Sequence, residues 1–183
     1  MTRLLMLFSK LAGYFEKLEQ TSSRLILIDI LAELFSEVKA GEIAKVVYLL
    51  QSRVAPFYEP IEIGMSEKLV AESIARSFGV KREEVLKEYG KVGDLGKVAE
   101  RHSGKQSASR IDSGQARMTV TDVFNVLTEI AGTNGEGTVE KKLNLLSGLL
   151  KKVDPVSAKH LVRIPLGASR LGIGDPTVLD GFA

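Results

Sequence analysis

The sequence contains no cysteine, no tryptophan and only two histidines among its 183 residues. The lack of cysteine excludes disulfide bonds, thiolate metal sites and a catalytic thiol. His102 and His160 are too few for a metal centre built from histidines. No run of apolar residues approaches the ~20 that a membrane-spanning helix needs. The N-terminal segment does not fit a signal peptide, because Lys10, Glu16 and Lys17 interrupt its apolar run. We therefore expect a cytoplasmic protein that makes no membrane contact.

The net charge of the chain is small, but its basic and acidic residues are unevenly distributed along the sequence. The formal net charge is +2. Residues 138–172 contain seven lysines and arginines against two acidic residues, whereas residues 23–64 contain four against six. The basic character is thus concentrated in one part of the chain, which is typical of a protein with an anionic partner.

Apolar residues recur at spacings of three and four, and no segment alternates as a strand does, so the sequence predicts a multi-helix, all-α fold in a single domain over residues 1–183. A first helix is expected to end at Leu18, a second to run from a cap at Ser22 or Ser23 to Val38, and a third to follow Gly41. Further helices are expected over 66–78, 82–89, 94–101, 120–131, 138–152 and 156–164, and Asp94 is the expected cap of the helix over 94–101. A last helix is expected to start at an Asp175 cap, with Pro176 in its first position. The small, polar residues of 102–117 predict a surface loop.

Two parts of the chain resemble each other, which predicts an internal pseudo-two-fold repeat with copies at about 22–79 and 137–183. Ser23 and its helix correspond to Thr138 and its helix at an offset of 115 residues. Ile63-Gly64 recurs as Ile173-Gly174 at an offset of 110. Chance similarity between amphipathic helices is the alternative, and the conserved order of three helices and one Ile-Gly corner favours duplication.

The segment GTNGEGTVEKKLNLL (132–146) is a glycine-rich loop that leads into a helix. Free backbone N–H groups and the positive end of the helix dipole suit a phosphate at such a place. Gly135 and Gly137 shape the loop, Thr138 is the expected N-cap, and Lys141 and Lys142 lie in the first turns. Two lysines that only solvate a helix face are the alternative, but loop, cap and lysines together favour anion binding.

The segment IPLGASRLGIG (164–174) is a second candidate for phosphate contact. Gly167, Gly172 and Gly174 allow close backbone approach, Ser169 can donate a hydrogen bond, and Arg170 supplies a cation. A simple turn between helices is the alternative for the last two glycines. Neither segment fits a nucleotide-binding P-loop or a G-x-G-x-x-G turn after a strand, so a polymeric phosphate backbone is the favoured partner.

Four segments resemble one family: GDLGKVAE (93–100), TNGEGTVEKKLNLLSGLL (133–150), AKHLVRIPLGASRLGIGDPTVLDGFA (158–183) and IEIGMSEKLVAESIA (61–75). They are similar to the N-terminal DNA-binding domain of ATP-dependent DNA ligases of the archaeal and eukaryotic replicative type. The similarity covers essentially the whole chain.

The resemblance implies a helical domain that binds nicked double-stranded DNA on its minor-groove side, through backbone contacts on both sides of the nick. When the family's DNA contacts are transferred to the matching positions of this sequence, they fall on Gly135, Gly137, Thr138, Lys141, Lys142, Gly167, Ser169, Arg170 and Leu171. Gly64, Ser66 and Lys68 are weaker candidates. Ala168 stands where some relatives have arginine, which puts one charge contact in doubt. Arg101 and Lys105 are expected to join this surface if the 102–117 loop folds over DNA.

The resemblance also implies that catalysis lies elsewhere, because the K-x-D-G motif of the adenylation domain does not occur here: LDG at 179–181 follows Val178. We expect no catalytic residue, metal or cofactor in this chain, with ATP and Mg²⁺ serving the full-length ligase, and an end shortly before the adenylation domain. Expected partners are nicked DNA, the ligase's own adenylation and OB domains and, without assignable residues, a sliding clamp. A role in DNA replication, repair and recombination at a prokaryotic nucleoid follows.

Two other functions stay open on the residues alone. The first is a helical scaffold that binds a protein partner without touching DNA, with the basic copy meeting an acidic surface. The second, ranked last, is an enzyme that uses the glycine-rich loop to bind a nucleotide.

Overall fold

The computed structural model describes residues 5–107 and 118–183, and these residues form ten helices and no strand, apart from an isolated bridge between Leu7 and Thr119. The helices are α1 (Phe8–Glu19), α2 (Arg24–Glu37), α3 (Ile43–Leu50), α4 (Glu67–Phe78), α5 (Arg82–Val92), α6 (Leu95–Ser107), α7 (Val120–Ala131), α8 (Thr138–Leu150), α9 (Pro155–Arg163) and α10 (Asp175–Asp180). The predicted all-α fold is confirmed.

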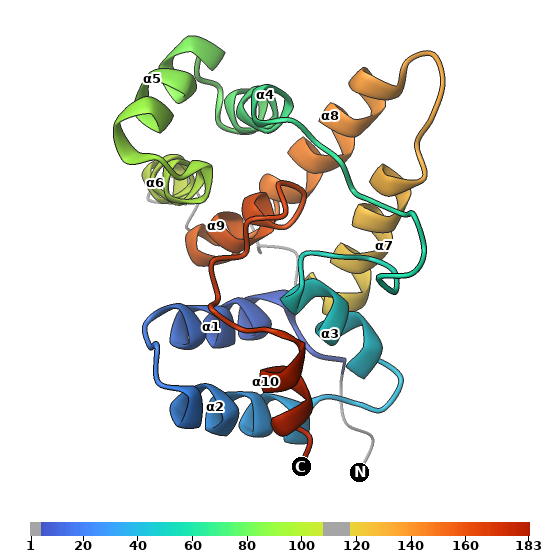
Figure 1. Cartoon of the computed structure of the whole chain (residues 1–183). Coiled ribbons are helices and arrows are strands. Elements are labelled where there is room, and N and C mark those ends of the chain that lie inside the picture. The colour runs from blue at the N-terminus through green and yellow to red at the C-terminus, as the bar shows by residue number, and fades with distance from the viewer. Residues whose placement is uncertain (1–4, 108–117) are drawn as a thin grey trace.

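The helices form two groups that meet at α9 (Figure 1). Helices α1, α2, α3 and α10 gather at one end of the molecule, α4, α5, α6 and α8 lie at the other, and α7 runs beside α3 and α8. Helix α9 packs against α6 on one side and α1 on the other. All its residues from Ser157 to Arg163 are buried, so α9 is the central helix of the core.

The last helix of each predicted copy packs against the other copy. Helix α4 contacts α8, and α10 contacts α2. At α10 the fit is close: a Cβ on Gly181 would lie 2.7 Å from Cβ of Leu31, and the ring of Phe182 stacks on that of Phe35 with centroids 4.0 Å apart. This reciprocal exchange is the arrangement expected of two units related by a two-fold axis, and the repeat itself stays a prediction.

The prediction of a loop over 102–117 is wrong for its first part. Helix α6 was expected to end at residue 101 but continues to Ser107, and residues 108–117 lie outside the described residues. The polar sequence concealed this because His102 and Ser103 are buried without belonging to an apolar stripe.

Two predicted helix caps are also wrong. Thr138 is the first residue of α8, and Gly137 is the N-cap, with a positive φ of 74° that favours glycine. Asp175 is likewise the first residue of α10, after an extended Gly174. Pro176 therefore occupies the second helical position instead of the first.

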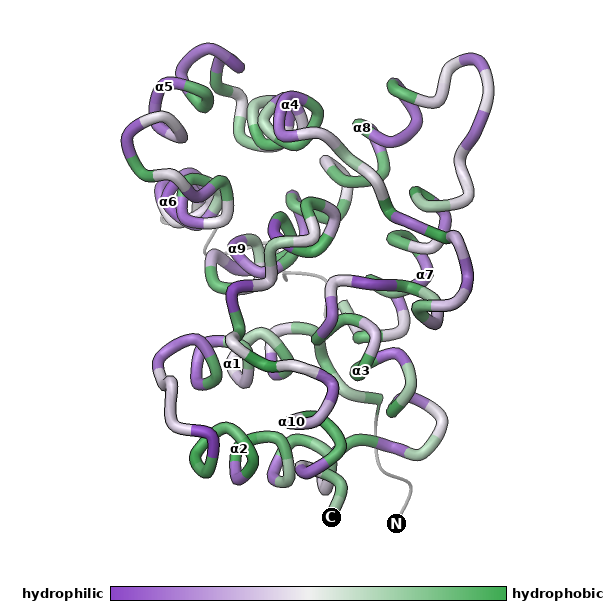
Figure 2. The backbone as a smooth tube through the Cα atoms, in the orientation of Figure 1, coloured by the Kyte–Doolittle hydropathy of each residue, from purple (hydrophilic) through white to green (hydrophobic). Residues whose placement is uncertain are grey.

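Hydropathy differs sharply between the helices (Figure 2). Helix α2 is largely hydrophobic, and its Leu25 and Ile26 are exposed, whereas α5 is largely hydrophilic and buries only Val85. Among the described helices, none has both the length and the apolar character needed to cross a bilayer.

Candidate nucleic-acid interface

Three of the predicted contact segments adjoin one another in the structure. The side-chain Nζ of Lys142 on α8 lies 3.5 Å from the carbonyl oxygen of Gly64. The backbone N–H of Met65 donates to the carbonyl oxygen of Pro165 at 3.5 Å. The turn before α4, the first turns of α8 and the segment after α9 are thereby brought to one region, although they lie far apart in the sequence.

The loop before α8 is exposed and its glycines have left-handed backbone conformations. Gly135 has φ of 92° and Gly137 has φ of 74°, values that other residues rarely adopt. The hydroxyl of Thr138 donates to the carbonyl oxygen of Gly135 and closes the loop. Lys141 pairs with Glu129 at 3.1 Å, and both side chains are half exposed. Such a surface pair contributes about 0–1 kcal/mol, so a phosphate can replace the carboxylate at little cost.

The segment after α9 is held in shape by backbone and side-chain contacts. Gly167 has φ of 67° and Arg170 has φ of 57°. The guanidinium of Arg170 donates to the carbonyl oxygen of Gly93 at 2.8 Å while its side chain stays half exposed. Ser169 is half buried, and Leu171 is only 1% exposed, so the leucine side chain packs in the core.

The turn before α4 resembles the loop before α8 in presenting a helix N-terminus to solvent. Gly64 has φ of 56°. The hydroxyl of Ser66 accepts a hydrogen bond from the backbone N–H of Leu69 at 3.3 Å, which makes Ser66 the N-cap of α4. Lys68 is exposed in the first turn. Arg76, further along α4, donates to both carboxylate oxygens of Glu140 at 2.7 and 3.2 Å and ties α4 to the start of α8.

A cavity of about 540 Å³ opens between the α3–α4 connection and the end of α9. Gly64 and Gly167 both line it, so the two glycine turns share one depression. Its remaining walls come from residues 51–53, 55–57, 59–63 and 65 and from residues 164–166. Phe57, at its edge, packs edge-to-face on Tyr58 with centroids 5.7 Å apart, and both side chains are exposed.

A buried ion pair supports the segment that carries Arg170. Nη2 of Arg163 on α9 is 2.5 Å from Oδ2 of Asp94 in the turn before α6. Burial alone would raise the pKa of Asp94, but the hydrogen bond from Arg163, the charges of Arg163 and Arg170 and the hydrogen bond from the Gly96 backbone together hold the pKa below its ordinary value. Asp94 also accepts from the backbone N–H of Gly96 at 2.9 Å, which confirms its predicted role as a cap. Gly93, whose carbonyl oxygen accepts the hydrogen bond from Arg170, directly precedes Asp94 in the chain.

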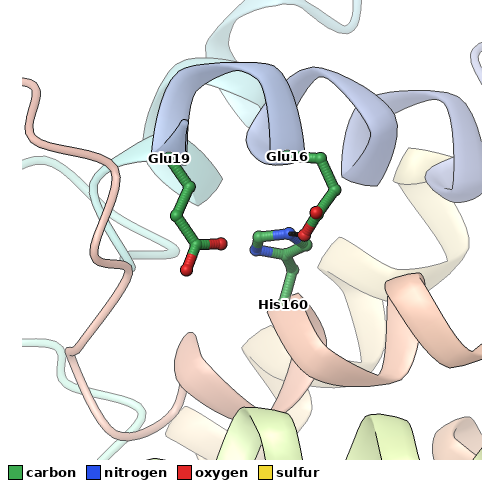
Figure 3. Close-up of side chains that lie close together, drawn as sticks. All are labelled: Glu16, Glu19 and His160. Carbon is green, nitrogen blue, oxygen red and sulfur yellow. Dashed lines mark hydrogen bonds and ion pairs between the residues drawn. The ribbon is translucent and has the colours of Figure 1, made fainter. Parts of the chain in front are cut away.

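A second polar cluster joins α1 to α9, where Glu16 and Glu19 point toward His160 (Figure 3). Nε2 of His160 lies 2.8 Å from Oε1 of Glu16. Lys159 pairs with Glu16 and, at 3.5 Å, with Glu19. Burial alone would raise the pKa of Glu16, but the hydrogen bonds and the charges of Lys159 and His160 together lower it below its ordinary value. Burial lowers the pKa of His160 below 6.5. The side chain of His160 is 1% exposed.

The supporting contacts were not visible in the sequence. Asp94 was identified only as a cap, and Arg163 was counted only as part of the basic segment. Arg101 and Lys105 lie on α6, where Arg101 pairs with Glu88 at 3.3 Å. Ala168 is exposed beside Gly167.

The fold and this surface together define a helical domain that presents cations and helix N-termini around glycine turns, which is a surface suited to a polyanion. The family model described as "DNA ligase N terminus" matches residues 7–183, and the chain belongs to this family.

Proteins similar to this chain include a "Probable DNA ligase" of Dictyoglomus turgidum, 46% identical over 178 residues, which cover 97% of this chain and 29% of that protein. A "DNA ligase" of Saccharolobus shibatae is 42% identical over 182 residues, which cover 96% of this chain and 30% of that protein. The chain thus spans about three tenths of the length of these relatives.

Proposed function

We propose that this domain binds nicked double-stranded DNA through its phosphate backbone, without sequence preference, and positions the nick for sealing by a DNA ligase. One observation carries the proposal: the contacts of Lys142 with Gly64 and of Met65 with Pro165 gather three glycine turns in one region. Membership of the DNA ligase N-terminus family supports DNA as the polyanion that this surface binds.

The chemistry of this region suits phosphates. The first turns of α4 and α8 each leave backbone N–H groups without helical partners, and the positive end of each helix dipole points outward. Lys68, Lys141 and Arg170 are exposed around these turns, and Lys142 is half buried beside them. Cations that exchange weak surface pairs for phosphates release counterions from DNA, so binding weakens as salt rises.

The proposal leaves adenylation and strand joining to other parts of a full-length ligase, which would use ATP and Mg²⁺. The adenylation and OB domains of that ligase, and a sliding clamp, are proposed as its further partners. The names of the relatives support the ligase assignment: one is called a probable DNA ligase and the other a DNA ligase, and this chain matches 29% and 30% of their lengths.

Fluorescence anisotropy with a labelled nicked duplex, an intact duplex of the same sequence and a single strand tests the proposal over a series of salt concentrations. We expect duplex binding with a steep negative salt dependence and weaker binding of the single strand. Tighter binding of the nicked duplex would show that the domain itself recognises the break. Failure to bind either duplex at low salt would contradict the proposal.

A protein-binding scaffold remains the second candidate, because aromatic and apolar side chains are exposed. Phe57 is 78% exposed, Tyr58 is 74% and Leu179 is 67%. Phe57 and Tyr58 also contact each other, and exposed apolar side chains that gather in a patch are typical of protein interfaces. Co-purification of a partner by a chain that ignores DNA would favour this function.

A further inference from the structure

The hairpin of α5 and α6 contains a buried histidine nitrogen that has no hydrogen-bond partner within residues 5–107 and 118–183. The side chain of His102 on α6 is 2% exposed. Its Nε2 makes no hydrogen bond with any described residue, although Oε1 of Glu88 lies 3.4 Å away. A buried polar atom without a partner is costly and calls for an explanation, of which an ion is one.

Two carboxylates of α5 face this nitrogen. Glu84 and Glu88 are four residues apart and therefore lie on the same face of the helix. One ligand atom from each glutamate and one from His102 all lie within 4.8 Å of one another. In a tetrahedral zinc site with bonds of about 2.1 Å, neighbouring ligand atoms are about 3.4 Å apart. The separation of Nε2 and Oε1 already has this value.

We propose that Glu84, Glu88 and His102 form a binding site for a divalent transition-metal ion of the zinc type. One imidazole nitrogen and two carboxylate oxygens favour zinc over magnesium or calcium, which prefer oxygen ligands alone. Three protein ligands leave a fourth position for water. Glu84 is exposed, which gives an ion access from solvent.

The outer contacts of this site are compatible with a metal. Arg101 reaches Oε2 of Glu88 at 3.3 Å, which leaves Oε1 for the ion. A cation on the second oxygen fixes the orientation of a ligating carboxylate, as outer contacts commonly do in metal sites. The ion would fasten α5 to α6, and α5 otherwise buries only Val85.

The cluster of Glu16, Glu19 and His160 has the same residue types but does not fit a metal. Nε2 of His160 already contacts Glu16. Lys159 and Arg163 are paired with the two carboxylates, so a metal ion would have to displace two cations. The cluster therefore serves as an internal control in the same molecule.

Titration of the 183-residue chain with Zn²⁺ tests the site by calorimetry and by thermal unfolding, after treatment with a chelator. We expect binding to one site and a Tm that rises with the Zn²⁺ concentration, because the ion binds the folded chain. The ¹⁵N resonances of the two imidazoles distinguish the clusters: those of His102 should shift on addition of Zn²⁺, and those of His160 should not. Co²⁺ should compete with Zn²⁺, and Mg²⁺ should not.

The decisive variant is Glu84→Gln, which removes one ligand from an exposed position and leaves the core intact. We expect Zn²⁺ affinity to fall at least about tenfold, in line with the loss of a metal ligand or its support. Glu83→Gln, at the adjacent exposed residue, is the matched control and should bind like the parent chain. Absence of Zn²⁺ binding, equal affinity in Glu84→Gln, or a shift at His160 in place of His102 would overturn the proposal.

Discussion

Arg163 and Asp94 form an ion pair in which the two side chains are only 1% and 4% exposed. The same guanidinium donates to both carboxylate oxygens of Glu19 at 2.9 and 3.0 Å. A single cation on α9 therefore joins α1 at one end of the molecule to the turn before α6 at the other. The pKa of Arg163 is raised, because its hydrogen bonds to Asp94 and Glu19 outweigh the effect of burial.

Replacement of Arg163 should destabilise the domain strongly. Arg163→Met removes the cation and leaves the buried carboxylate of Asp94 with only the more distant Arg170, at 3.9 Å, as a charge partner among the described residues. Removal of one partner of a buried ion pair typically costs about 3–5 kcal/mol. Lys10→Met is the matched control, because Lys10 pairs with Glu37 at the surface, and such pairs contribute about 0–1 kcal/mol. Urea unfolding of both variants measures the difference. Equal stabilities would show that the buried pair makes no net contribution.

Helix α6 approaches α9 closely at Gly96, so a larger residue at this position should destabilise the domain. A Cβ at this position would lie 2.7 Å from the carbonyl oxygen of Lys159 and 2.8 Å from Nε of Arg163. Gly96→Ala should therefore lower stability by about 1–3 kcal/mol, as overpacked cores do. A Cβ on Gly90, in α5, would meet no atom of the described residues within 4 Å, so Gly90→Ala should raise stability by about 0.5–1 kcal/mol. Stabilisation by both substitutions would refute the close contact.

Most helices were predictable because their signals are local. Helix α7 begins and ends as predicted, since Thr119 and Asp122 form a capping box and apolar residues follow at helical spacing. The prediction ended α6 too early because its last residues are small or polar, and because the buried residues near its end, His102 and Ser103, do not belong to an apolar stripe. Thr138 was mistaken for the N-cap because threonine and glycine are both good caps, and only the backbone angle of Gly137 distinguishes them.

The contacts between distant segments could not be predicted. Arg163 and Asp94 are 69 residues apart, and Lys142 and Gly64 are 78 apart. A sequence shows that each residue is charged or flexible, but the partner depends on how the helices pack. The candidate residues were thus found segment by segment, whereas their proximity had to come from the structure.

The two lysines that follow the loop before α8 should contribute to DNA affinity. Lys141→Ala combined with Lys142→Ala should weaken binding to duplexes of any sequence alike, because phosphate contacts carry no sequence information. The slope of log affinity against log salt should flatten by roughly 2, about 0.9 for each phosphate that a lysine no longer neutralises. Anisotropy over a salt series measures both effects.

The control for this experiment removes the same charge elsewhere. Lys10 and Lys17 on α1 pair with Glu37 and Glu33, much as Lys141 pairs with Glu129. Lys10→Ala combined with Lys17→Ala should leave the salt slope unchanged. If this control weakens binding equally, net charge alone accounts for the effect. If the α8 variant binds like the parent chain, the start of α8 is not part of the interface.

Stability should fall with decreasing pH in two stages. Burial lowers the pKa of His160 below its ordinary 6.5, so the unfolded chain takes up this proton first, and stability is lost as pH falls from 6.5 through the lower folded value. The pKa values of Glu16 and Glu19 are also lowered, because the hydrogen bonds and positive charges of Lys159, His160 and Arg163 together outweigh burial. Their contribution is present above pH 4.5 and is lost as pH falls through their folded values.

The variant His160→Gln separates the two stages. Glutamine can donate to Glu16 but does not titrate, so the loss of stability beginning near pH 6.5 should shrink while the stage below pH 4.5 persists. Free energies of unfolding measured by urea across this range, at constant ionic strength, give both stages. An unchanged first stage in the variant would assign that proton to another group and would show that His160 is not protonated on unfolding in this range.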